Sequence, residues 1–342
     1  MKISHLRQET VNKRKKSYIT EDYFNHERAM MMRYERMQSK KQKKKKWWKT
    51  FLLLLFLLLI FVTGYFYFQY MSGITHSKQK LDGEKTVYTF NGERDENGAT
   101  NILLIGSDAR GKEKSRADTI MVAHYHPDKK TFKLTSIMRD TYVDIPGNGK
   151  NKINSAFAIG GPELLRQTIK ENFDLDLQYY TIVDFQGFVQ LIDVAFPDGV
   201  KVNVEKKMSE GIDVTLKPGV QKLDGTHLLG YVRFRQDAIG DFGRVERQQE
   251  TMQTIASELT RLQTIPKLPK LIGVVTPFVN TNLTATDMMS IGTDFVTKQG
   301  SIKTQRIPME GTFIDKRISG VGAVLSIDFE QNKTAIKQFL RQ

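Results

Sequence analysis

The 342-residue chain contains no cysteine, and this absence limits its possible chemistry. Without thiols it has no disulfide framework, no thiolate metal site and no cysteine nucleophile. The sequence also lacks a Walker phosphate-binding loop and the glycine-rich dinucleotide fingerprint. Ser107 has no glycine two residues before it, as a nucleophile elbow requires. Several common routes to catalysis are therefore not indicated.

Excess positive charge is scarce outside the first 50 residues. Residues 1–50 hold 16 Lys and Arg against 5 Asp and Glu, whereas residues 51–342 hold 36 against 33. A nucleic-acid-binding domain needs its Lys and Arg clustered on the folded face. We therefore expect no nucleic-acid partner for the main domain, and we assign the basic character to the N-terminal tail.

No charged residue interrupts the apolar run Phe51–Tyr70. Twenty helical residues span about 30 Å, the thickness of a membrane's hydrocarbon core. Trp47 and Trp48 precede the run, and three tyrosines lie in its last six residues, as in the aromatic belts of membrane helices. A cleaved signal peptide would need a shorter apolar core and a small-residue cleavage site. The pattern predicts a transmembrane signal anchor over residues 47–70.

A lysine cluster predicts the direction of this anchor. Seven lysines lie just before or at the start of the run: Lys40, Lys41, Lys43, Lys44, Lys45, Lys46 and Lys49. Cytoplasmic flanks are rich in Lys and Arg, so we expect a cytoplasmic N-terminus and an extracellular C-terminal part in the cell membrane, with the tail held near anionic lipid. The predicted division is a basic tail (1–46), the anchor (47–70), a polar stalk (71–95) and an extracellular catalytic domain (96–342).

The rest of the chain alternates strand patterns with helix patterns, which predicts a layered α/β domain. A short apolar strand is expected at Asn101–Ile105. Two β-rich runs, Thr119–His126 and Thr131–Met138, are separated by Pro127-Asp128-Lys129-Lys130, which predicts a hairpin. Pro162 is expected to open a helix, and a strand is possible within the stalk at Thr86–Phe90. The predicted architecture is α-β-α behind a single N-terminal transmembrane helix.

Arginines and carboxylates gather at the predicted strand and helix ends. The candidate residues are Asp108, Arg116, Asp118, Arg139, Arg233, Arg235, Asp241, Arg244 and Gln248. Arginine suits phosphate because its planar fork donates two parallel, charge-assisted hydrogen bonds. Mg²⁺ is usually bound by one or two carboxylates together with substrate phosphates. The set indicates a pyrophosphate–Mg²⁺ site, against the alternative of ordinary surface ion pairs or, for Asp241, a helix cap.

The histidines favour a structural role. His124 and His126 would share one strand face, but no third ligand is in view, so ordinary strand positions are favoured over a metal site. His227 lies on a predicted helix without an obvious serine partner.

At these clusters the sequence resembles the LytR-CpsA-Psr family of envelope proteins. The resemblance covers about Asn101 to Gln249 and rests on the motifs NILLIGSDAR, RADTIMVA, SIMRDTYVDIP, KINSAFAIGGPELL, LDGTHLLGYVRFR and GDFGRVERQQ. Met138 replaces the proline that the family usually has before its motif arginine, and Pro197-Asp198-Gly199 replaces a usual Gly-Gly. Both departures fall on framework positions and leave the expected site residues in place.

The resemblance implies a domain with an apolar pocket for a polyprenyl chain. The implied reaction transfers an anionic glycopolymer, of the wall teichoic acid or capsule type, from undecaprenyl pyrophosphate to peptidoglycan. The implied acceptor is the 6-hydroxyl of N-acetylmuramic acid, and the product is a phosphodiester.

The resemblance also implies roles for the site residues. The implied pyrophosphate ligands are Arg116, Arg139, Arg233 and Arg235. The implied Mg²⁺ ligands are Asp108 and Asp118. The implied residues that complete the pocket are Asp241, Arg244 and Gln248. Either Asp118 or Asp241 could act as the base. The implied catalytic group is therefore Arg116, Asp118, Arg139, Arg233, Arg235 and Asp241.

Two other classes of function stay open. The chain could be a membrane-anchored transcriptional attenuator or regulator acting through its basic tail, which predicts salt-dependent, sequence-selective DNA binding by residues 1–46. It could also be a non-catalytic binder of polyprenyl pyrophosphate, or a pyrophosphatase, which would release polymer without joining it to an acceptor.

Overall fold

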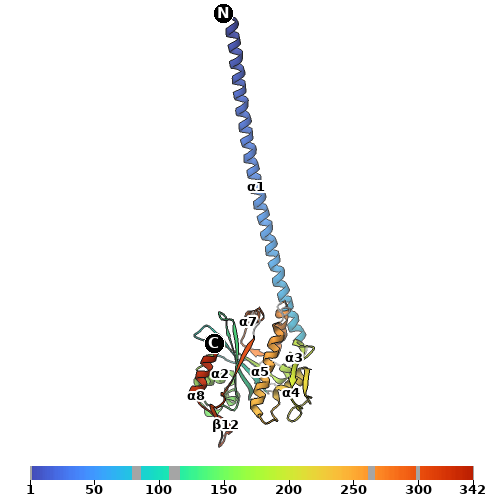
Figure 1. Cartoon of the computed structure of the whole chain (residues 1–342), viewed down its shortest axis with the longest axis vertical. Coiled ribbons are helices and arrows are strands. Elements are labelled where there is room, and N and C mark those ends of the chain that lie inside the picture. Colours follow the sequence, from blue (N-terminus) through green and yellow to red (C-terminus); the bar gives the residue numbers. More distant parts are fainter. Residues whose placement is uncertain (1, 79–85, 108–115, 261–265, 298–300, 342) are drawn as a thin grey trace. The chain divides into compact units, whose positions relative to one another are not determined.

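The structure is a computed structural model that describes the chain except residues 1, 79–85, 108–115, 261–265, 298–300 and 342. The chain forms two compact units, Met1–Tyr65 and Phe66–Gln342. Helix α1 (Lys2–Lys78) makes up the first unit and continues into the second, which we call the C-terminal unit (Figure 1). The site residues predicted from the sequence all lie in the C-terminal unit.

One stretch of α1 could cross a membrane. The segment Trp47–Thr75 is long and apolar enough to do so, and it contains the predicted span. From Trp47 to Phe68 its side chains are exposed, for example Leu55 at 52% and Phe61 at 72%. A helix that is apolar on all sides and uncovered by protein is suited to lipid. The helix is therefore compatible with a single-pass membrane anchor.

The centre of the C-terminal unit is a six-stranded mixed sheet in the order β10-β3-β2-β1-β6-β9. The strands are β1 (Thr100–Ser107), β2 (Ala117–His126), β3 (Thr131–Ile137), β6 (Tyr179–Asp184), β9 (Asn280–Thr281) and β10 (Ile302–Ile307). β1, β2 and β3 form an antiparallel meander, whereas β1–β6 and β3–β10 are parallel pairs. The strand at Asn101–Ile105 and the hairpin predicted after it are confirmed.

Helices cover both faces of this sheet. On one face, α2 (Ile153–Phe173) and α8 (Phe329–Arg341) share a core with residues of β1, β2 and β3, including Ile137. On the other face, Ser136 accepts a hydrogen bond from Gln249 of α5 (Gly240–Leu259). Successive residues of a strand point to opposite faces, so α2 and α5 lie on opposite sides of β3. The predicted α/β class and α-β-α layering are confirmed.

Four other helices belong to the C-terminal unit. They are α3 (Phe185–Ala195), α4 (Gly225–Arg233), α6 (Leu268–Val275) and α7 (Ala285–Thr297). Asp224 caps α4 by accepting a hydrogen bond from the backbone N–H of His227 at 2.9 Å. Helix α2 begins nine residues before Pro162, but it is interrupted at Gly160 and Gly161, where φ at Gly161 is +66°. Pro162 therefore opens only the second part of that helix.

Three two-stranded hairpins flank the main sheet. They are β4 (Tyr142–Ile145) with β5 (Gly149–Lys152), β7 (Val200–Val204) with β8 (Gly219–Leu223), and β11 (Phe313–Ile318) with β12 (Gly322–Ile327). The β11–β12 hairpin contacts the segment that follows β3, because the backbone N–H of Leu325 donates to the carbonyl oxygen of Asp140 at 2.9 Å. This contact lies next to Arg139, one of the predicted site residues.

The segment predicted as a stalk is partly packed. Residues 71–78 continue α1, residues 79–85 lie outside the described residues, and residues 86–95 contain no strand. The prediction of a strand at Thr86–Phe90 was therefore wrong. Tyr88 and Phe90 pack against Tyr180, with ring centroids 6.2 Å and 5.1 Å apart, so aromatic contacts and not a β-ladder hold this segment. The four-segment division of the chain stays a prediction.

Candidate functional site

The candidate site lies where β2 begins and β3 ends. Because β2 and β3 are antiparallel, these two points are neighbours. The register pairs Met121 with Ser136, and three residues further along it places Asp118 opposite Arg139. Asp241 and Arg244 occupy the first turn and a half of α5, which packs against β3. Three elements therefore bring charged side chains to one edge of the sheet.

Four side chains form a closed ion-pair network, which we call the Arg–Asp cluster: Asp118, Arg139, Asp241 and Arg244. Arg139 pairs with Asp118, and its Nη2 lies 3.5 Å from Oδ1 of Asp241. Nη2 of Arg244 lies 3.0 Å from the same Oδ1 and donates to the backbone oxygen of Asp118 at 3.0 Å. The carboxylates of Asp118 and Asp241 therefore each lie within ion-pair distance of both guanidinium groups.

The Arg–Asp cluster is largely withdrawn from solvent. The side chain of Arg244 is 6% exposed and that of Arg139 is 16% exposed. Burial lowers the pKa of Arg244, and the positive charges of Arg139 and Arg235 act in the same direction. Burial would also lower the pKa of Arg139, but Asp241, Asp118 and Asp140 raise it above its usual value. The carboxylates of Asp241 and Asp118 oppose this lowering of the Arg244 pKa, and an added anion would favour the charged form of Arg244 in the same way.

Some buried polar atoms of the cluster lack a hydrogen-bond partner among the described residues. They are Nε of Arg139, Nε of Arg244 and Oδ1 of Asp241. Oδ1 of Asp241 lies close to both guanidinium groups as an ion pair, but neither contact has the direction of a hydrogen bond. Buried polar groups are usually satisfied, so exceptions need an explanation. Two N–H donors and one carboxylate oxygen that make no hydrogen bond among the described residues suit a ligand that carries both anionic oxygens and a cation.

Side chains of helix α5 also bind the backbone of the segment that contains Arg233 and Arg235. Nη1 of Arg247 lies 3.0 Å from Oδ2 of Asp237, and its Nη2 donates to the backbone oxygen of Phe234. Nε2 of Gln248 donates to the backbone oxygen of Val232 at 3.3 Å. These contacts fix the backbone on either side of Arg233 and Arg235. Gln248 therefore acts on the backbone in this structure, and its predicted place in the pocket stays a prediction.

Arg233 and Arg235 differ in their surroundings. The guanidinium of Arg233, at the end of α4, lies 4.4 Å from the ring centre of Phe185 and 3.5 Å from Asp213. Arg235 is exposed, and its charge contributes to the lowered pKa of Arg244 after the larger effect of burial. Arg235 is therefore within electrostatic reach of the Arg–Asp cluster, whereas Arg233 is held by contacts of its own.

The remaining predicted residues are less defined. Arg116 is exposed and directly precedes β2, two residues from Asp118. Asp108 lies outside the described residues. The structure thus brings Asp118, Arg139, Asp241 and Arg244 together, and the convergence of all nine residues on one ligand stays a prediction.

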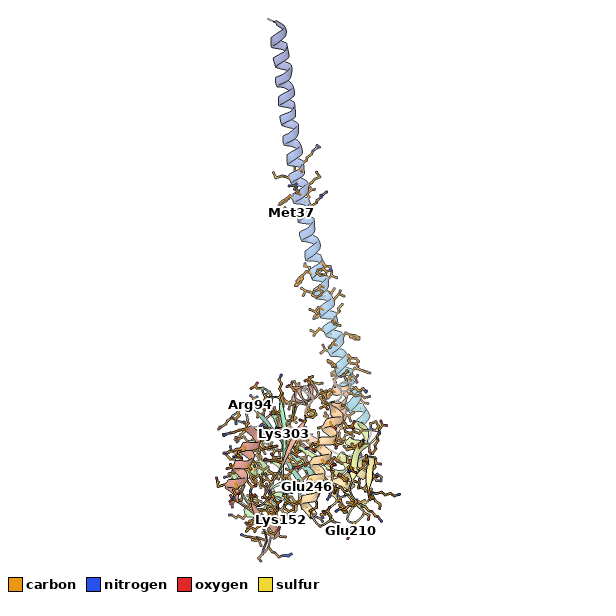
Figure 2. The ribbon with its side chains drawn as sticks, in the orientation of Figure 1. Met37, Arg94, Lys152, Glu210, Glu246 and Lys303 are labelled. Atoms are coloured by element: carbon orange, nitrogen blue, oxygen red, sulfur yellow. The ribbon has the colours of Figure 1, made fainter. Side chains whose placement is uncertain are left out.

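Sequence patterns missed some of the supporting residues. Nζ of Lys152, labelled in Figure 2, lies 2.7 Å from Oδ1 of Asp140, whose Oδ2 is 3.6 Å from Nε of Arg139. The side chain of Asp237 is only 2% exposed and accepts from the backbone N–H of Gly240 at 2.9 Å. Asp140 directly follows Arg139 in the sequence, so its contribution to the site could have been predicted. The partners of Lys152 and Asp237 depend on tertiary contacts and gave no signal in the sequence.

The donors present fit Mg²⁺ as a companion of phosphate. The part of the chain described here contains no group of three or more His, Asp or Glu residues arranged to bind a metal ion. Mg²⁺ does not require such a group, because one or two carboxylates and substrate phosphates usually suffice. Asp118 and Asp241 supply two carboxylates, and Oδ1 of Asp241 accepts no hydrogen bond.

The strand histidines belong to a separate part of the molecule. His124 is buried near the far end of β2, and its Nδ1 lies 2.6 Å from Oδ1 of Asn101. Asn101 in turn donates to the backbone oxygen of Asp176 at 2.7 Å. The structural interpretation of His124 therefore agrees with its contacts.

Comparisons with known proteins relate the site to a family. A family model described as the LytR_cpsA_psr family matches residues 64–338. The chain is 44% identical over 277 residues to the regulatory protein MsrR of Staphylococcus aureus strain COL, covering 81% of this chain and 84% of that protein. It is 33% identical over 259 residues to the polyisoprenyl-teichoic acid–peptidoglycan teichoic acid transferase TagU of Oceanobacillus iheyensis, covering 74% and 78%.

A solved structure shares the fold. The structure described as TagT bound to LI-WTA aligns with a TM-score of 0.60 at 26% identity, covering 75% of this chain and 98% of that one. The family model extends from the end of the apolar helix to α8 and includes every predicted site residue. The chain therefore belongs to the LytR_cpsA_psr family.

Proposed function

We propose that this chain is a transferase that joins an anionic glycopolymer, of the wall teichoic acid or capsule type, to peptidoglycan. The donor is linked to undecaprenyl pyrophosphate and the product is a phosphodiester. TagU is named for the same kind of reaction, and TagT has a structure described as bound to LI-WTA. Both similarities support a glycopolymer donor and a peptidoglycan acceptor for this chain.

The observation that carries the proposal is the Arg–Asp cluster. Arg139 and Arg244 are 105 positions apart in the sequence, yet they contact the same carboxylates at one edge of the sheet. Each has a buried Nε without a hydrogen-bond partner among the described residues. Guanidinium groups that share one small space are suited to a diphosphate, whose two phosphoryl groups offer several anionic oxygens.

The proposed step is a displacement at phosphorus. The oxygen of an acceptor hydroxyl, the 6-hydroxyl of N-acetylmuramic acid, attacks the phosphorus nearest the glycopolymer. The bond between that phosphorus and the bridging oxygen breaks, and polyprenyl phosphate leaves with the electron pair. The hydroxyl proton passes to Asp118 or Asp241. No ATP is needed because the pyrophosphate bond of the donor is already activated.

The residues of the cluster would act by position and charge. Catalysis of phosphoryl transfer depends mainly on alignment and on neutralising the charge that develops on phosphate oxygens. Arg139 and Arg244 would bind those oxygens, with Arg116, Arg233 and Arg235 as further ligands. Bound Mg²⁺ would add positive charge at the diphosphate, held by Asp118 with Asp108 or Asp241.

The proposed location follows from the anchor and the lysine cluster. With a cytoplasmic N-terminus, the C-terminal unit would lie on the outer face of the cell membrane, where a lipid-linked donor and peptidoglycan are both within reach. The regulatory name of MsrR is the one observation that favours a regulator. The small charge excess of residues 51–342 gives that alternative no support from the folded part.

The test is transfer of labelled, lipid-linked polymer to peptidoglycan by the full chain. We expect Arg116→Ala and Arg235→Ala each to abolish transfer while the thermal unfolding midpoint stays unchanged, because both side chains are exposed. Arg317→Ala, at an exposed arginine of β11, is the matched control and should retain transfer.

Three outcomes would count against the proposal. Full transfer by both variants would show that Arg116 and Arg235 are not needed for the reaction. Release of free polymer without an acceptor linkage would favour a pyrophosphatase. Sequence-selective DNA binding by residues 1–46, in a chain that transfers nothing, would favour the regulator.

A further inference from the structure

The last turns of α1 pack tightly against α6. A Cβ atom on Gly73 would lie 2.9 Å from the backbone nitrogen of Val274, and one on Gly273 would lie 3.2 Å from Cα of Gly73. Such short distances mean that the two helix backbones touch, as they do at crossings built from small residues. Oγ of the buried Ser77 donates to the backbone oxygen of Val274 at 3.1 Å. Helix α6 is therefore fixed beside the end of α1 within the C-terminal unit.

With the anchor in a membrane, this contact would place α6 at the level of the membrane surface. The candidate span Trp47–Thr75 includes Gly73, so α6 packs on residues that belong to its final turns. Helices α3 and α6 contact each other, and both are short and apolar in sequence. Apolar helices beside the end of a membrane span suit the boundary between headgroups and acyl chains.

A cavity of about 360 Å³ lies in this region, and we call it the α6 notch. Its lining residues are Gln69, Val194, Lys267, Lys270, Leu271 and Val274. Among the described residues, the lining contains aliphatic side chains, one amide and two lysines, and it contains no acidic residue. Both lysines are exposed and lie three positions apart, so they share one side of the helix start.

We propose that the α6 notch binds an anionic phospholipid of the surrounding membrane. The phosphate of the headgroup would bind Lys267 and Lys270, and an acyl chain would lie against Val194, Leu271 and Val274. The charge of the lysines and the absence of acidic lining residues favour an anionic headgroup over a zwitterionic one. The proposal rests on the anchor crossing the membrane as described above, and it does not depend on the transfer reaction.

The consequence is a fixed height for the C-terminal unit above the bilayer. The crossing at Gly73 and Gly273 joins α6 to the end of the anchor, and a lipid in the notch would add a second attachment at the same level. A unit held in this way would keep its position relative to the membrane surface, where a lipid-linked donor resides.

The test measures lipid retention by the full chain, purified in mild detergent from vesicles of equal phosphatidylglycerol and phosphatidylcholine. Native mass spectrometry should show one phosphatidylglycerol retained in preference to phosphatidylcholine. Lys267→Gln combined with Lys270→Gln should reduce that preference roughly 30-fold, because a basic residue near an anionic surface contributes about 1 kcal/mol and about 1.4 kcal/mol corresponds to tenfold.

Matched variants make the result specific. Lys201→Gln with Lys316→Gln removes the same charge at two exposed positions on β7 and β11 and should leave retention unchanged. Leu271→Gln should lower retention of both lipids by making part of the notch lining polar. Equal loss in the notch and control variants would overturn the proposal. Retention of polyprenyl phosphate, lost from the notch variant instead of phosphatidylglycerol, would also overturn it.

Transfer activity separates this proposal from the proposed function. If lipid retention depends on the two lysines in a chain that transfers no polymer, the notch stands and the transferase proposal fails. If the chain transfers polymer but lipid retention does not depend on the two lysines, the proposed lipid site fails and the transferase proposal stands.

Discussion

Arg139 and Arg244 share their counterions, and this arrangement shapes how an anion would bind. Both guanidinium groups lie close to Oδ1 of Asp241, and both lie within ion-pair distance of Asp118. A diphosphate would compete with these carboxylates for the same donors. Exchange of one anionic partner for another avoids leaving a buried charge unpaired, which is the costly outcome in a low-dielectric site. The carboxylates released in this way would be free for a cation or for the acceptor proton.

His124, a buried residue outside the Arg–Asp cluster, should make the stability of the fold depend on pH. Burial lowers its pKa from 6.5 to about 4, against an opposing effect of Asp95. As pH falls, the unfolded chain binds this proton before the folded chain does, so the stabilisation is full above about pH 6.5 and is lost toward pH 4. The loss from this one group should reach about 2 kcal/mol at pH 5.

Urea unfolding of the full chain in detergent at pH 7.5 and pH 5 measures this loss. His124→Gln removes the titrating group, so the variant should lose about 2 kcal/mol less than the unchanged chain between these pH values. The control is His227→Gln, at a side chain that is 45% exposed. An unchanged pH dependence in His124→Gln would show that another group is responsible.

Residues at strand ends could be predicted from the sequence, whereas residues paired across elements could not. Asp118 and Arg139 flank two runs joined by a recognisable turn, so the hairpin alone makes them neighbours. Asp237 and Arg247 meet only because α5 packs back along the chain that precedes it. No period or turn signal in the sequence encodes that contact.

Among the elements, the apolar strand β1 and the hairpin strands β2 and β3 matched their sequence patterns, whereas β4, β5 and β11 were not predicted. The β4–β5 and β11–β12 hairpins have strands of four and six residues, and most side chains of β11 are exposed. Without an apolar alternation, such strands resemble loops. The predicted helix start at Pro162 came nine residues too late, because Gly160 and Gly161 interrupt a helix that already begins at Ile153.

The crossing of α1 and α6 gives a prediction for an element contact. Gly73→Leu would place a side chain against the backbone of Lys270 and Val274, neither of which can move without shifting α6. Inserting a side chain into a filled space usually destabilises by about 1–3 kcal/mol. We therefore expect faster hydrogen exchange of the amides in α6 and a lower unfolding midpoint for the C-terminal unit.

Gly64 provides a control on the same helix. A Cβ atom at Gly64 has no atom within 4 Å, so Gly64→Leu should leave both measurements unchanged. If Gly73→Leu and Gly64→Leu behave alike, the close crossing is not what stabilises α6.

The uneven distribution of charge along the whole chain suggests different roles for the basic N-terminal end and for the nearly neutral remainder. The first 50 residues carry a net +11, and the remaining 292 carry a net +3. The basic end suits attraction to the anionic inner surface of a membrane. The nearly balanced remainder suits a unit in which arginines and carboxylates pair with each other, as they do in the Arg–Asp cluster. The apolar helix between them would keep the two roles on opposite sides of the bilayer.

The lysine cluster therefore predicts which side each end occupies. The absence of cysteine makes the measurement direct, because a single introduced thiol is the only one in the chain. In intact cells, a membrane-impermeant maleimide should label Ser257→Cys, an exposed position on α5, and should not label Met32→Cys, which is 55% exposed on α1. Replacing the seven lysines between positions 40 and 49 with glutamine should make Met32→Cys reactive in part of the population, because those charges set the direction of insertion. Labelling of Met32→Cys in a chain that keeps its lysines would reverse the assigned orientation, and it would put the Arg–Asp cluster on the side away from peptidoglycan.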